Sequence, residues 1–200
     1  MGDAEKKKKS IIAKIRNLAT LMKMHLPEID LERGVLLQCK HRHFILPMEV
    51  LVGIEDATKQ YYGQRTPELL YEAGKIGGRI EGMIGIEQVG RDLDKFIDYC
   101  IISASASGWG RHEVISIDKD AFTAIIRVYN ALTPELIKSD DPVCNLHLGF
   151  VTGIIEEFFH VEMVGRETKC KGKGDEYCEF YIAPSDDVDE KTISVMRGLF

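Results

Sequence analysis

The chain has 200 residues, of which 44% are hydrophobic and 29% are charged, a balance typical of a globular protein with a sizeable core. The formal net charge of −6 argues against general nucleic-acid binding, which rests on a basic surface. No apolar run reaches membrane-spanning length. The five cysteines are an odd number and no secretory signal opens the sequence, so we expect a reducing cytoplasm and no disulfide framework.

The first 30 residues predict a separate N-terminal element. A lysine run, Lys6 to Lys9, precedes an apolar stripe at helical spacing from Ile11 to Met22, and Pro27 ends the pattern. Such a basic amphipathic helix can lie on an anionic membrane surface. The alternative is that it packs on its own domain or on a second copy, and we prefer that interpretation because the stripe lacks a bulky aromatic anchor.

Two short strands are expected between Gly34 and Leu46, one before and one after the sequence K-H-R-H. His41 and His43 alternate onto one face and could bind a metal, although charged residues at a turn are commonly just solvated. Cys39 is expected to be a packed thiol.

Helices follow, beginning at Pro47 and again at Thr66-Pro67, where threonine caps and proline takes the first helical position. The second helix contains five glycines, each costing about 1 kcal/mol relative to alanine. Close approach of another helix or room for a ligand would compensate, and we favour packing. Helical spacing continues from Val89 to Ser107.

The segment Gly108-Trp109-Gly110 breaks this helix, and alternation on both sides of Asp118–Asp120 then predicts a β-hairpin. Trp109 and His112 are the aromatic residues with polar tips nearest to a candidate ligand pocket, and Tyr129 is a further candidate for the pocket wall. The alternative places Trp109 in the core and His112 on the surface at the start of a strand.

A candidate zinc site occupies the stretch from Pro142 to Pro184. Three thiols and a carboxylate form a complete tetrahedral ligand set, which comprises Cys144, Glu167, Cys170 and Cys178. The pattern after Asp141-Pro142 predicts a helix with Cys144 in its first turn, where the helix dipole favours a thiolate.

Two strands around Gly172 and Gly174 are expected to form a second hairpin after this helix. Glu167 and Cys170 are an odd number of positions apart, so the first strand must end or bulge between them for both to reach one ion. The following Lys169, Lys171 and Lys173, with Arg166, could offset the negative charge. The alternative is that these cysteines are ordinary buried thiols.

The sequences D-P-V-C, L-G-F-V-T-G and E-T-K-C-K-G-K-G-D-E-Y-C-E-F resemble the 4-vinyl reductase domain family. That family is a small-molecule-binding module related in fold to phenol-sensor domains, TRAPP subunits and haem nitric oxide sensors. The resemblance covers about residues 108–184 and extends more loosely back to the forties. It implies that zinc is held by Cys144, Glu167, Cys170 and Cys178. The Y-x-S-x-R motif of the haem sensors does not occur in this sequence.

We therefore predict an α/β (α+β) domain in which helices pack on an antiparallel sheet, of the NO-signalling and Golgi-transport ligand-binding type. The expected organisation is an N-terminal amphipathic helix at 1–30, a ligand-binding domain at 31–184 and a C-terminal tail or short helix at 185–200. The predicted function is a zinc-stabilised module that binds a small hydrophobic or aromatic ligand as sensor or carrier, without enzymatic activity, in a homodimer. The alternatives are a dimeric TRAPP-like scaffold and an accessory protein in tetrapyrrole vinyl reduction.

Overall fold

The computed structural model describes residues 19, 21–23 and 25–186 of the chain. The helix predicted for the N-terminus lies almost entirely outside the described residues, as does the short helix expected after Pro184. Among the residues that the structure describes, no helix is long and apolar enough to cross a membrane.

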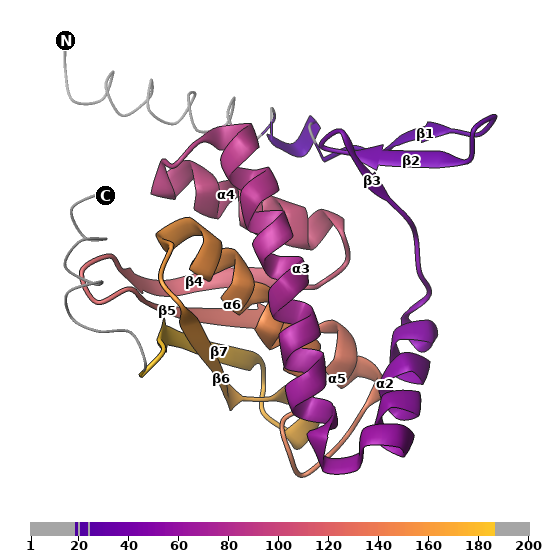
Figure 1. The fold of residues 1–200 in the computed structure, drawn as a ribbon, viewed down its shortest axis with the longest axis vertical. Helices are drawn as coiled ribbons and strands as arrows, with labels where there is room; N and C mark the ends of the chain where they lie inside the picture. The colour runs from indigo at the N-terminus through magenta and orange to yellow at the C-terminus, as the bar shows by residue number, and fades with distance from the viewer. Residues whose placement is uncertain (1–18, 20, 24, 187–200) are drawn as a thin grey trace.

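The centre of the fold is a four-stranded sheet with the strand order β4-β5-β7-β6, in which all neighbours are antiparallel (Figure 1). The strands are β4 (Arg111–Asp118), β5 (Thr123–Tyr129), β6 (Met163–Lys169) and β7 (Cys178–Pro184). The period-two alternation of the sequence puts every second side chain on one face, so Ala124, Ile126 and Val128 of β5 are buried. Both hairpins predicted from the sequence are therefore confirmed.

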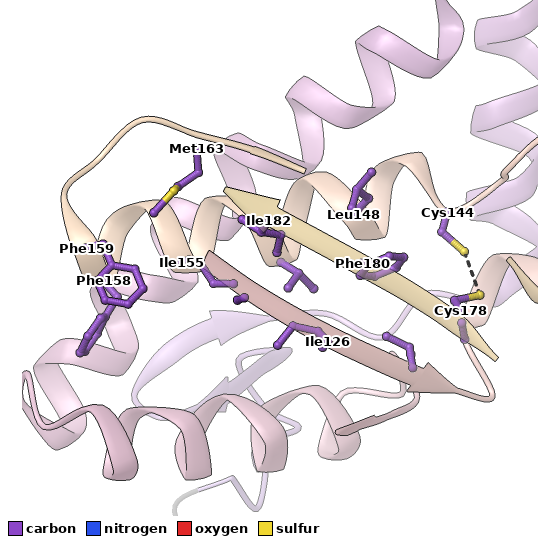
Figure 2. Close-up of a cluster of buried hydrophobic side chains, with 14 of the residues drawn as sticks. Ile126, Cys144, Leu148, Ile155, Phe158, Phe159, Met163, Cys178, Phe180 and Ile182 are labelled. Carbon is purple, nitrogen blue, oxygen red and sulfur yellow. Dashed lines mark hydrogen bonds between the residues drawn. The ribbon is translucent and has the colours of Figure 1, made fainter. Parts of the chain in front are cut away.

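The buried face of the sheet is covered by α6 (Asn145–Phe159). Figure 2 shows Phe180 and Ile182 of β7 beneath this helix, with Leu148 and Ile155 nearby. Phe158 and Phe159 close one end of this core, and both are only 1% exposed. Burial of side chains of this size on both elements stabilises the pairing of helix and sheet by about 1.5–3 kcal/mol each.

The helix α3 (Thr66–Val89) forms an outer layer that crosses α6 (Figure 1). Its glycines let the two backbones touch, because a Cβ atom at Gly78 would lie 2.0 Å from the carbonyl oxygen of Phe150. The fit is mutual, since a Cβ atom at Gly149 of α6 would lie 1.9 Å from the carbonyl oxygen of Tyr71. Close helix packing, rather than room for a ligand, therefore explains the glycines of this helix.

The helix α4 (Leu93–Ala106) lies beside α6 and contacts β4. The sequence predicted one helical stretch from Val89 to Ser107, and this prediction was wrong at its start. Gly90 ends α3 with a φ of 77°, and Asp92 then caps α4 by accepting a hydrogen bond from the backbone N–H of Lys95. The break redirects the chain, so that α4 packs over the sheet instead of extending α3.

The N-terminal region forms a small antiparallel sheet of β1 (Glu28–Asp30), β2 (Val35–Gln38) and β3 (His41–His43). The second strand was expected at Phe44–Leu46, but those residues are extended without strand pairing, and Phe44 and Ile45 are about four-fifths exposed. They lead into α2 (Met48–Tyr62), which begins after Pro47 as predicted and ends at Gly63. None of the side chains of α2 is buried.

Short helical turns complete the described part of the chain: η1 (Gly63–Arg65), α5 (Leu132–Leu136) and η2 (Lys171–Lys173). The observed arrangement of helices on one face of an antiparallel sheet confirms the predicted fold class.

Candidate metal centre and apolar cavity

Cys144, Glu167, Cys170 and Cys178 converge at one end of the sheet. Their ligand atoms all lie within 4.8 Å of one another. They come from four places: the N-cap of α6, the strand β6, the residue just after β6 and the first residue of β7. Figure 2 shows the side chains of Cys144 and Cys178 pointing toward each other. Among the described residues, no other group of histidine, cysteine and acidic side chains is close enough to share an ion.

Two local features bring the four residues together. The pairing of β6 with β7 shifts register between Glu167 and Lys169, which is the irregularity that the odd spacing to Cys170 required. Cys144 differs from the prediction, because the helix begins one residue later, at Asn145, and the cysteine is its N-cap. From this position Cys144 donates its backbone N–H to Glu167 Oε2 over 3.1 Å.

The sulfur atoms lie at the spacing of a tetrahedral centre. Cys144 Sγ and Cys178 Sγ are 3.5 Å apart, whereas a disulfide bond measures about 2.0 Å, and all five cysteines of the chain are free. Zinc–sulfur bonds of about 2.3 Å in a tetrahedron place the sulfurs about 3.8 Å apart. The three cysteines are at most 1% exposed, so water does not compete for this position.

The charge of the site has little compensation from side chains. Glu167 Oε1 is buried and has no hydrogen-bond partner among the described residues, and burial raises the pKa of this carboxyl to about 8. The lysines next to the site in sequence are engaged elsewhere: Lys171 Nζ pairs with Glu135, and Lys169 Nζ donates to the hydroxyl of Tyr177. A bound cation would satisfy the orphaned oxygen, so the donor set and its surroundings fit a divalent zinc ion.

An apolar cavity lies between α4, α6 and the strands β4 and β5. It encloses about 670 Å³, its opening included. Most of its wall is aliphatic or aromatic, from residues such as Phe96, Ile101, Ile126, Val151, Ile155 and Phe158. A cavity of this size and composition is typical of a binding site for a small molecule. Because α6 carries both Cys144 and one wall of the cavity, the metal centre and the cavity share a helix.

The polar part of the wall consists of His112, His147 and Trp109. His112 Nε2 and His147 Nε2 are 2.9 Å apart, and the ring of Trp109 stacks on Phe150 with centroids 5.0 Å apart. Burial lowers the pKa of His112, and together with the neighbouring His112 it lowers the pKa of His147 well below its usual range. Both imidazoles are therefore neutral at pH 7.

The structure places Trp109 and His112 at the cavity and places Tyr129 elsewhere. Tyr129 is the residue after buried Val128 on β5, so it lies on the outer face of the sheet, where the guanidinium of Arg111 covers its ring and its hydroxyl donates to Glu113. The alternation of β5 carried this information. His147 was not predicted, because nothing in its local pattern distinguishes it from a surface position on a helix.

His41 and His43, considered above as metal ligands, lie apart from the metal centre on β3. His41 Nε2 is 3.8 Å from Glu87 Oε2, and His43 Nδ1 donates to the carbonyl oxygen of His41. Neither histidine belongs to the group of residues that could share an ion.

Comparisons with known proteins support the resemblance drawn from the sequence. Residues 125–184, which include Cys144, Glu167, Cys170 and Cys178, match the family model of the 4-vinyl reductase domain. The uncharacterized protein MJ0150 of Methanocaldococcus jannaschii is 27% identical over 161 residues, which are 71% of this chain and 92% of that protein.

Solved structures show the same fold at low sequence identity. The phenol-responsive sensory domain of the transcription activator PoxR, solved with phenol, is 14% identical with a TM-score of 0.76, and the match covers 91% of this chain and 95% of that one. A vinyl-4-reductase family protein of Methanocaldococcus jannaschii is 20% identical with a TM-score of 0.50, over 72% of this chain and 85% of that one. A trafficking protein particle complex subunit 3 from Naegleria fowleri, covalently bound to palmitic acid, is 13% identical with a TM-score of 0.55, over 72% of this chain and 95% of that one. The expected relationship to sensor and TRAPP domains is thus confirmed at the level of the fold.

Proposed function

We propose that this chain is a zinc-stabilised binding module for a small hydrophobic or aromatic molecule and acts as a sensor or carrier. The observation that carries the proposal is the apolar cavity, whose wall of aliphatic and aromatic side chains is interrupted by two histidines and one tryptophan. The match to the 4-vinyl reductase domain and the likeness in fold to a sensory domain solved with phenol support it. We place the binding domain at residues 31–184.

In this proposal zinc has a structural role. A catalytic zinc keeps one position open for water, whereas Cys144, Glu167, Cys170 and Cys178 fill all four positions of a tetrahedron. The ion would tie the start of α6 to the ends of β6 and β7. It would thereby fix the helix that provides His147, Phe150 and Val151 to the cavity.

A dimeric scaffold is the second candidate, because apolar side chains are exposed on the segment that leads into α2 and on α2 itself. They include Phe44, Ile45, Val50 and Ile54. Exposed apolar groups so close together are typical of protein contacts. The cavity favours the binding module, since a scaffold has no need of an internal space, and we propose a homodimer in either case.

Native mass spectrometry of protein purified without added metal tests the proposal directly. We expect one zinc per chain, a dimer mass and an additional mass from a retained small molecule. The single tryptophan, Trp109, lines the cavity and provides a second measurement, because its fluorescence should change when indane, an apolar bicyclic hydrocarbon, is added. A protein that carries no small molecule and does not respond to indane would contradict the binding module and leave the scaffold.

A further inference from the structure

The two histidines of the cavity have their protons assigned by their neighbours. His112 Nδ1 lies 3.2 Å from the carbonyl oxygen of Gly110, which can only accept a hydrogen bond, so the proton of His112 is on Nδ1. A neutral imidazole carries one proton, and His112 Nε2 is therefore a bare acceptor.

The assignment passes from one ring to the other. His147 Nε2 is 2.9 Å from His112 Nε2, so His147 must donate through Nε2. The remaining nitrogen, His147 Nδ1, is then also bare. It is a hydrogen-bond acceptor that is buried and has no partner among the described residues. Only 2% of His147 is exposed, and its ring lines the cavity.

We propose that this His112–His147 relay makes the cavity selective for apolar molecules that carry a hydrogen-bond donor, a hydroxyl or N–H group. The inference rests on the cavity holding a ligand, as proposed above. A donor on the ligand would satisfy Nδ1, which is otherwise shielded from water. A carbonyl or ether oxygen at the same place would face a second acceptor and leave both atoms unsatisfied.

The order of the relay is what sets the selectivity. The carbonyl of Gly110 belongs to the backbone and cannot reverse its polarity, so the chain of hydrogen bonds runs in one direction. A buried polar group left without a partner weakens binding by about tenfold or more. We therefore expect a hydroxyl compound to bind at least about tenfold more tightly than the matched ketone.

Three bicyclic probes of nearly equal size test this selectivity on the full-length, zinc-loaded protein. They are 1-indanol, which has a hydroxyl group, 1-indanone, which has only a carbonyl group, and indane, which has neither. Dissociation constants are measured by Trp109 fluorescence and by calorimetry. The expected order of affinity is 1-indanol first, with 1-indanone no better than indane.

Two variants separate the relay from the shape of the cavity. His147→Phe keeps a ring but removes the acceptor, so the ratio between 1-indanol and 1-indanone should fall to about one while indane still binds. His112→Phe removes the group that fixes the tautomer of His147, and the ratio should fall there as well. Ile117→Val, a control elsewhere on the cavity wall, should leave the ratio unchanged. Zinc content and Tm verify that each variant is folded.

The outcomes distinguish the relay from the proposed function. Equal affinity of the wild-type protein for 1-indanol and 1-indanone, or tighter binding of 1-indanone, would overturn the relay while leaving the binding module intact. The same conclusion follows if folded His147→Phe protein keeps the wild-type ratio. If none of the three probes binds, the binding module fails and the relay fails with it.

Discussion

Replacing Cys170 with serine should remove the zinc and destabilise the fold. Cys170 is fully buried between the end of β6 and η2, and a serine hydroxyl is a poor substitute for a thiolate ligand. If free zinc exceeds the dissociation constant about a thousandfold, binding contributes about 4 kcal/mol to the free energy of unfolding. For a domain of this size, each kcal/mol corresponds to about 2–4 °C. We therefore expect Tm to fall by about 8–16 °C, as measured by circular dichroism alongside elemental analysis of zinc.

Cys39→Ser is the matched control, because Cys39 is also a buried cysteine but belongs to a different cluster, with Leu21, Ile84 and Tyr99. This variant should retain one zinc per chain. Treating the wild-type protein with a strong chelator should reproduce the Tm of Cys170→Ser, and adding zinc back should restore only the wild type. A Cys170→Ser protein with full zinc content and wild-type Tm would refute a structural site at these four residues.

Three further predictions concern the fold and the cavity. Gly149→Ala should lower the free energy of unfolding by more than about 2 kcal/mol, because its Cβ atom would meet a backbone oxygen of α3 at 1.9 Å, whereas Gly53→Ala on α2, with no atom within 4 Å, should stabilise by up to about 1 kcal/mol; urea denaturation compares them. Burial raises the pKa of Glu156, but its bonds to Lys75, Arg79 and a backbone N–H outweigh this and lower the pKa in the folded state, so Glu156 stabilises the fold above about pH 4.3 and loses that effect as the pH falls; Glu156→Gln should therefore flatten the pH dependence of unfolding between pH 6 and 3, and an unchanged slope would contradict this assignment. Ala104→Phe should fill the cavity and abolish the fluorescence response to indane without changing zinc content, and a normal response would place the ligand elsewhere.

The candidate metal centre was predictable because its chemistry is carried by residue type. Cysteines and a glutamate are distinctive ligands, and the odd spacing between Glu167 and Cys170 already required an irregular strand, which the shifted register confirms geometrically. The exact place of Cys144 was not predictable, because a helix boundary depends on which backbone groups find partners. Here Glu167 binds the N–H of Cys144 from a distant strand, and the helix starts one residue later.

Glycines illustrate the limit of local reasoning. The sequence revealed a helix with an unfavourable composition, and therefore a need for compensation. The compensating partner is Gly149 and Gly153 on α6, about 75 positions later in the chain, and the contact depends on the angle at which the two helices cross. Conversely, Gly90 separates α3 from α4 at a point where helical spacing continued on both sides.

The sequence by itself determined the elements whose signals are local: the two hairpins by their alternation, the helix starts by their prolines, and the candidate ligand set by its residue types. The tertiary structure alone decided which side chains meet across long separations. His112 and His147 are 35 residues apart, and their hydrogen bond exists because β4 and α6 pack on opposite sides of one cavity. Periodicity reports the face of each element, but the register between two elements is set by the packing of the whole core.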